Sequence, residues 1–298
     1  MNTPTIDAAL VEELITKWTK QMPDWVGELN SKPYAKALLP VDNLGASVQI
    51  DQVIDYSKTG NGAKVCAKGH APAGTGVEAT PTPFPMFQLL DGFGIHDRDM
   101  TLDKQLQSRN VMACMDNIQI LENSLAIAGD TPHGIVGLVQ AAQANPNGVI
   151  ASTEITASWD AASSTIDPYA DLVLAISHMG SKYKPRWLVG NTVDLSYLAK
   201  KNTYTRTPFY QEIAPLLGKS PMDKPETWQI AVDSDILATG KVYLATLDKR
   251  AGKFGVSENP HIMPPVRQRG GVTWFDVAEW SSPEYMDYTG FVEIDIKK

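Results

Sequence analysis

The sequence predicts an α+β protein, and three observations support that class. A long amphipathic helix is expected over residues 101–128. Segments with strand-like content stand on both sides of this helix, the last of them near residue 296, so strands far apart in the chain must pair. Hydrophobic residues make up 43 % of the 298 residues and charged residues 20 %, which is enough apolar material for one or two packed domains.

The charge balance and the cysteine count narrow the functional classes. The 26 Lys and Arg residues face 34 Asp and Glu residues, a formal charge of −8, which argues against a protein that works mainly by gripping nucleic acid. We expect no transmembrane helix and no secretory signal, because apolar runs are short and acidic residues come early. Cys66 and Cys114 are expected to be free thiols in a reducing compartment.

The first part of the chain predicts a helix, an irregular stretch and a strand. Residues 6–20 place Val11, Leu14 and Trp18 on one face of an amphipathic helix. Prolines punctuate residues 21–45, which we expect to be irregular. Residues 46–56 alternate between apolar and polar side chains and therefore predict a strand.

The composition changes sharply at residues 57–85. This segment contains five glycines and four prolines, and its large apolar groups are few before Phe84. Such a segment cannot bury a core of its own. It is therefore either an ordered arm that packs on something else or a loop. Residues 86–98 then return to strand-like content.

The helix over residues 101–128 is the strongest single prediction. Thr101 can cap its start, and Gly129 can end it in a left-handed conformation. At about 1.5 Å per residue it would be about 40 Å long. The side chains that we expect on its core face are Leu106, Met112, Met115, Ile118, Leu121 and Leu125.

Shorter elements are expected in the second half of the chain. Asp167 and Pro168 begin a predicted helix that ends near Met179. A second short helix is expected over residues 194–201. The predicted strands cover residues 186–190, 228–232, 241–246, 271–277 and 290–296.

Motifs for catalysis or cofactor binding are missing from the sequence. It contains no phosphate-binding loop, no H-E-x-x-H, no G-x-S-x-G and no C-x-x-C, so we expect no catalytic, cofactor or metal site. The run from His96 to Asp99 could hold a metal or an acid/base pair, but a salt-bridged strand edge is favoured. Cys66 stands between Lys64 and Lys68, which could lower the pKa of its thiol, whereas Cys114 is expected in the core. Arg267 and Arg269 could contact an acidic partner or nucleic acid, and a solvated edge is favoured.

The order of these elements, together with one segment, resembles a known fold family. Residues 122–138, ENSLAIAGDTPHGIVGL, carry a long helix to a Gly and then into a G-I-V-G-L turn. This pattern, after a Gly/Pro-rich arm and a long helix, is similar to the Hong Kong 97-type capsid fold of tailed-phage major capsid proteins and encapsulin shell proteins. As an order of elements, the resemblance covers nearly the whole chain.

The resemblance implies a division into domains. The expected parts are an N-terminal helix and arm (1–45), a peripheral domain (46–149) with an extended loop (57–85) and a spine helix (102–128), an axial domain (150–265), and C-terminal strands that return to the peripheral domain (266–298). The extended loop would overlap a neighbouring subunit, and the residues implied in that contact are Lys58, Asn61, Lys64, Lys68 and Phe84. Some members of this fold cross-link a loop lysine to an Asn of another subunit, but no matching Asn or catalytic Glu is identified here.

The resemblance leaves two shell functions open. The first is a major capsid protein, not an enzyme, whose pentamers and/or hexamers close into an icosahedral virion head around DNA held without sequence specificity. The head would assemble in the host cytoplasm, with a separate scaffold or cement protein as a possible partner. The second is an encapsulin that encloses a cargo enzyme, with residues 6–20 lining the interior. The encapsulin stretch that normally follows this helix is not recognisable, which favours the capsid. A third reading is a soluble α+β enzyme that uses His96 and Asp97.

Overall fold

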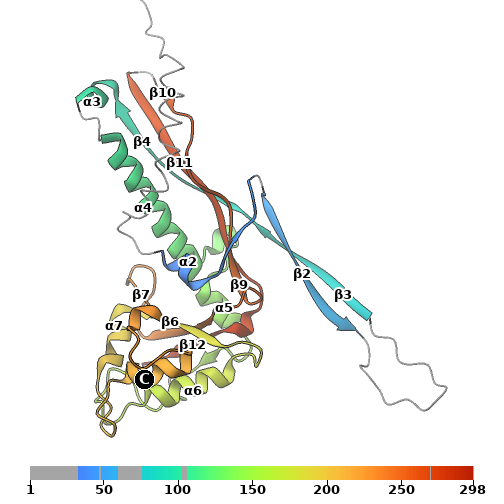
Figure 1. Ribbon diagram of the computed structural model, residues 1–298, viewed down its shortest axis with the longest axis vertical. Helices are drawn as coiled ribbons and strands as arrows, with labels where there is room; N and C mark the ends of the chain where they lie inside the picture. Colours follow the sequence, from blue (N-terminus) through green and yellow to red (C-terminus); the bar gives the residue numbers. More distant parts are fainter. Residues whose placement is uncertain (1–32, 47, 60–75, 103–105, 269, 298) are drawn as a thin grey trace, which may run out of the picture.

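The computed structural model describes residues 33–297 apart from residues 47, 60–75, 103–105 and 269. It shows an elongated unit built on a long sheet and helix α4, a compact unit built on a second sheet, and a hairpin that projects away from both (Figure 1). The helix predicted over residues 6–20 lies outside the described residues. Among the described helices, none is long and apolar enough to span a membrane.

The first sheet has five strands. They are β1 (Val41–Asn43), β4 (Phe87–His96), β9 (Gly252–Ile262), β10 (Val266–Gln268) and β11 (Val272–Tyr285). The order is β1-β9-β11-β10, and β4 also pairs with β11 over a ten-residue antiparallel register. Strand β9 was not predicted, because its first six residues are all buried and show no alternation. Strand β11 continues well beyond the predicted end at residue 277, through Pro283, which pairs with Phe254.

Strands β2 (Ile50–Thr59) and β3 (Gly76–Pro85) form the projecting hairpin, here called the arm. The backbone N–H of Met86 donates to the carbonyl of Gln49, so the odd-numbered positions of β3 turn their backbone nitrogens away from β2. Three of those positions are Pro81, Pro83 and Pro85. The outer edge of β3 therefore lacks three donors in a row, which disfavours pairing with a further strand there.

The predicted long helix is observed as α3 (Asp97–Leu102) and α4 (Leu106–Ile127). Helix α4 packs on one face of β4 and β11, where Met115, Ile118 and Leu125 are buried. Leu106 and Met112 are half-buried. The prediction for Leu121 is wrong, since 42 % of its surface is exposed. Near Leu121, the buried face of α4 is instead occupied by three polar residues, Gln119, Glu122 and Asn123.

This difference between two neighbouring apolar residues can be measured. Ile118→Ala is expected to lower the free energy of unfolding by about 2–5 kcal/mol, because it leaves a cavity in the core. Leu121→Ala is expected to change it by less than about 0.5 kcal/mol, as at an ordinary surface position. Urea unfolding of the isolated subunits compares the two. If both substitutions lowered the free energy of unfolding equally, Leu121 would be packed in solution and its assigned exposure would be wrong.

The turn after α4 is fixed by glycine. Gly129 has φ 70°, as predicted for a left-handed helix end. A Cβ atom added at Gly129 would lie 2.6 Å from the backbone nitrogen of Gly137, so only glycine fits this approach. The Gln140 side chain closes the turn by accepting from the N–H of Gly137 and donating to the carbonyl of Ala128.

The second sheet also has five strands. They are β5 (Val149–Ile150), β6 (Pro185–Asn191), β7 (Gln229–Val232), β8 (Lys241–Thr246) and β12 (Phe291–Asp295), in the order β5-β12-β8-β6-β7. The α-helices outside the α3–α4 pair are α2 (Tyr34–Leu38), α5 (Leu138–Ala144), α6 (Pro168–His178), α7 (Thr192–Ser196) and α8 (Phe209–Ile213). Short 3₁₀ helices cover Thr131–His133, Tyr197–Ala199, Ala214–Leu217, Pro225–Thr227 and Tyr288–Gly290.

Two strands cross the expected domain boundary at residue 265. Strand β9 was expected with the axial domain but belongs to the first sheet, and β12 was expected with the peripheral domain but is internal to the second sheet. The reason is that the chain passes between the sheets three times, between β4 and β5, after β8 and after β11. Tyr285 and Phe291 pack edge to face at the last crossing, with ring centroids 5.0 Å apart, and one buried core runs through both units.

Candidate functional site: assembly surfaces

The base of the arm is fastened to the first sheet by a single lysine. Lys253 on β9 has only 10 % of its side chain exposed. Its Nζ atom lies 3.0 Å from Asp42 Oδ2, bonds the carboxylate of Asp51 on β2, and lies 3.5 Å from Glu284 Oε2 on β11. One cation therefore joins three strands of the sheet to the first residues of the arm. We call these four residues the arm-base cluster.

Glu284 is the least solvated member of this cluster. Its side chain is fully buried, and its oxygens make no hydrogen bond to the described residues. Burial, helped by the negative charge of Asp51, raises the pKa of Glu284 to about 7, although Lys253 opposes the shift. The arm-base cluster therefore holds a carboxyl group whose pKa lies near neutral pH.

This burial makes subunit stability depend on pH. A carboxyl group whose pKa rises from 4.5 to about 7 on folding binds more protons in the folded state between those values. The free energy of unfolding contributed by Glu284 therefore falls as pH rises from about 4.5 through about 7. Glu284→Gln is expected to flatten that part of the profile in urea titrations, and the exposed Glu226→Gln is expected to leave it unchanged. Identical slopes for wild type and Glu284→Gln would contradict this.

A second buried charge cluster holds α2 against α4. Lys36 Nζ lies 3.0 Å from Glu122 Oε1 and 3.3 Å from Glu279 Oε1, and both carboxylates are almost completely buried. Burial and the neighbouring Glu122 raise the pKa of Glu279 to about 8. Asn123 on α4 also accepts the backbone N–H of Ala35 at 3.0 Å. These contacts tie the first described residues to the C-terminal third of α4.

The face of the first sheet opposite α4 is apolar and open. Leu90 is 53 % exposed there and Trp274 is 37 % exposed. A Cβ atom at Gly94 would lie 2.9 Å from the Trp274 ring, so glycine lets the indole lie flat across β4. Trp274 Nε1 also donates to Asp276 Oδ1 at 2.7 Å, which fixes the ring. We call this surface, made by Leu90, Gly94, Trp274 and Asp276, the open sheet face.

The charged run at residues 96–99 lies at the edge of the first sheet. Asp97 accepts from Arg267 Nη2 at 2.6 Å, which joins the start of α3 to β10. His96 is exposed, and its Nδ1 accepts from the backbone N–H of Arg98. A charged strand edge was expected here with Arg98 as the paired cation, and the ion pair that the structure shows is that of Asp97 with Arg267. Across the described part of the chain, no group of three His, Cys, Asp or Glu side chains is arranged to hold a metal ion.

Of the two cysteines in the sequence, the structure describes one. Cys66 lies in residues 60–75, outside the described part of the chain. Cys114 is buried on α4, where burial raises the pKa of its thiol to about 12. The prediction of a core cysteine at position 114 agrees with this environment.

Comparison with solved structures identifies the architecture. No family model and no curated protein sequence matches the chain. The capsid of Myoviridae phage XM1 matches with a TM-score of 0.64 and 13 % identity over 89 % of this chain and 91 % of that chain. A virus-like particle from Pyrococcus furiosus matches with a TM-score of 0.62 and 14 % identity over 95 % and 99 %. The capsid of an empty GTA particle matches with a TM-score of 0.61 and 12 % identity over 91 % and 91 %.

The chain has the Hong Kong 97-type capsid fold. In the terms of this fold, β2 and β3 form the extended arm, α4 is the spine helix, and the two sheets are the peripheral and axial sheets. Of the residues expected in the arm contact, Lys58 lies on β2 opposite Val77, and Phe84 is half-buried on β3. Asn61, Lys64 and Lys68 lie outside the described residues.

Proposed function

We propose that this capsid-fold chain is the major capsid protein of a tailed-phage-like head, which self-assembles around DNA. The observation that carries the proposal is the extended arm, a two-stranded sheet whose strands pair only with each other among the described elements. An isolated hairpin is marginally stable in water, and ordering it costs conformational entropy. A neighbouring copy supplies the surface that stabilises it.

The open sheet face is the surface that fits the arm of a neighbouring copy. The arm offers Ile50, 56 % exposed, and the exposed prolines of β3. Because the outer edge of β3 lacks donors at Pro81, Pro83 and Pro85, that side of the arm docks through side chains rather than by adding a strand to β3. Leu90 and Trp274 offer an apolar surface of matching character.

The similar structures support a shell, and they fit two kinds of content, DNA or a protein cargo. The XM1 and GTA structures are named as capsids, and the Pyrococcus furiosus structure is named as a virus-like particle that this chain matches over 99 % of its length. An encapsulin-type shell around a protein cargo is therefore the alternative. In either case copies form pentamers, with or without hexamers, and for the capsid the mature location is the virion.

Light scattering and negative-stain microscopy of the purified protein test the shell. At least sixty copies of 32.5 kDa give round particles of about 2 MDa or more. Nuclease-protected DNA in particles from the native source supports the capsid, and a protected protein cargo supports the alternative. A protein that stays a monomer or dimer, even when co-expressed with its genomic neighbours, contradicts both.

A further inference from the structure

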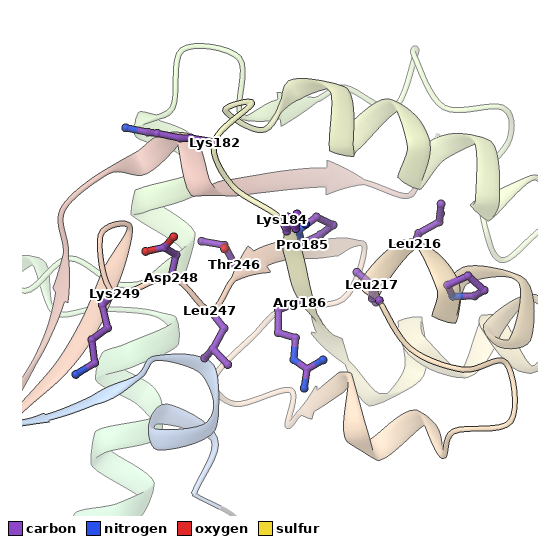
Figure 2. Close-up of a pocket in the computed structure, with 12 residues that line it drawn as sticks. Lys182, Lys184, Pro185, Arg186, Leu216, Leu217, Thr246, Leu247, Asp248 and Lys249 are labelled. Atoms are coloured by element: carbon purple, nitrogen blue, oxygen red, sulfur yellow. The ribbon is translucent and has the colours of Figure 1, made fainter.

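A groove lined by cations opens beside the axial sheet (Figure 2). It encloses about 830 Å³. Lys182 and Lys184 line it from the segment that leads into β6, Arg186 lines it from the start of β6, and Lys249 lines it from the turn after β8. The apolar lining includes Leu217 and Leu247, and other leucine and proline side chains contribute to it. We call this site the basic groove.

Two of these cations form ion pairs with described residues and two do not. Lys182 bonds Asp287 at 2.5 Å, and Lys249 lies 3.5 Å from Asp42. Lys184 and Arg186 have no carboxylate within 4.0 Å among the described residues. Asp248, which also lines the groove, is bound by Arg250 at 2.8 Å. The groove therefore presents uncompensated positive charge on a chain whose net charge is −8.

An acidic loop lies at the opposite end of the same sheet. The groove is at the beginning of β6, whereas the last residue of β6, Asn191, pairs with Val232 at the end of the parallel strand β7. Asp233 and Asp235 follow directly, and both are exposed. Neither makes an ion pair with a described residue. At about 3.3 Å per residue, β6 separates the two charged sites by about 20 Å.

We propose that the acidic loop of one copy, Asp233–Asp235, occupies the basic groove of the next copy. The proposal rests on the proposed shell function and names a contact between its axial units. Complementary sites at opposite ends of one sheet make a head-to-tail contact, which closes into a ring when the rotation between copies permits. Lys184 and Arg186 then gain carboxylates, which the described residues of their own copy do not provide.

The apolar lining of the groove favours a polypeptide over a nucleic-acid backbone. Phosphodiesters have no group that gains by covering Leu217 and Leu247. The acidic loop, in contrast, carries the half-buried Ile236 next to Asp235. A loop that combines charge with an apolar residue matches both parts of the groove.

Zero-length cross-linking tests the contact directly. Copies labelled with ¹⁵N are mixed with unlabelled copies under assembly conditions and treated with a carbodiimide, which joins lysine amines to carboxylates. We expect mass spectra to show a heavy peptide containing Lys184 joined to a light peptide containing Asp233 or Asp235. If the copies associate and no such mixed cross-link forms, the proposal is overturned.

Exchanging the charges of the two sites tests the same contact through its effect on assembly. Lys184→Glu/Arg186→Glu and Asp233→Lys/Asp235→Lys are each expected to raise the critical concentration for assembly about tenfold or more, since like charges then meet in every contact. Combining the four substitutions is expected to restore assembly. Lys201→Glu/Lys224→Glu is the matched control, because it reverses two exposed lysines outside the groove. Circular dichroism verifies that each variant folds.

The outcomes separate this proposal from the proposed function. Wild-type copies that give mixed cross-links but never close into particles contradict the shell and support the contact. Normal assembly of both charge-reversed pairs overturns the contact and leaves the shell intact. If Lys184→Glu/Arg186→Glu particles form normally but lose enclosed DNA, the groove binds nucleic acid and the proposal is wrong.

Discussion

Subunits without the extended arm are expected to fold but to form no particles. The sharpest variant deletes residues 52–83 and joins Asp51 to Phe84 through Asn-Gly, because these two residues are directly opposed as a hydrogen-bonded pair, which is the pair that a two-residue turn closes. Asp51 and its bond to Lys253 are kept. No described residue of the deleted segment belongs to either hydrophobic core. Light scattering should therefore show free subunits. Their thermal unfolding midpoint should lie within about 3 °C of that of wild-type subunits.

A point substitution on the open sheet face tests the same contact without removing a large segment of the chain. Trp274→Ser on the open sheet face is expected to lower particle yield strongly, because it removes the exposed ring that we propose as the docking surface of the arm. Tyr204→Ser removes an aromatic ring that is 91 % exposed elsewhere on the molecule, and should leave the yield unchanged. Full-mass particles from the arm deletion would contradict the role of the arm, and outright unfolding would place the arm in the subunit core.

Lys36→Met is expected to cost about 3 kcal/mol of unfolding free energy at pH 8, because it leaves Glu122 and Glu279 buried without their cation. Since burial raises the pKa of Glu279 to about 8, the loss should shrink at pH 5, where this carboxyl group is protonated. Urea unfolding at the two pH values measures both effects.

Two further variants show whether this loss comes from buried charge. Lys36→Met/Glu279→Gln is expected to be more stable than Lys36→Met alone, because one uncompensated carboxylate is gone. Lys249→Met breaks an exposed pair with Asp42 at 3.5 Å and should change stability little. A Lys36→Met loss that is the same at pH 5 and pH 8 would indicate lost packing instead.

The predictable part of the fold is the part with local signals. Strand β8 was predicted with its observed bounds, and helix α6 follows from Asp167, whose side chain accepts from the N–H of Ala170. Gly129 ends the long helix as predicted. Strand β9 and helix α5 were missed, because the first begins as a continuously buried stretch and the second begins beside Gly137 in a glycine-rich connector. Strand β9 lacks the period that identifies a strand, and α5 buries Leu138, Ala141 and Ala142 at helical spacing but over only 7 residues.

The charge clusters could not be predicted from spacing. Lys36 and Glu279 are 243 residues apart in sequence, and Lys253 and Asp51 are 202 apart. No pattern of neighbouring residues in the sequence indicates that side chains so far apart form an ion pair. The same long-range contacts explain the error at Leu121, because Glu122 points inward to reach Lys36 and displaces the apolar stripe. The basic groove likewise joins a segment before β6 to a turn after β8.

The position of β12 has a consequence for how the protein is made. This strand lies between β5 and β8, although β5 is synthesised about 140 residues earlier. Until residue 295 has emerged from the ribosome, the axial sheet is split and the edges of β5 and β8 have no partner. A nascent or prematurely terminated chain therefore has a separate peripheral sheet but an unfinished axial unit. A chain that stops before β12 therefore lacks the strand that joins β5 to β8.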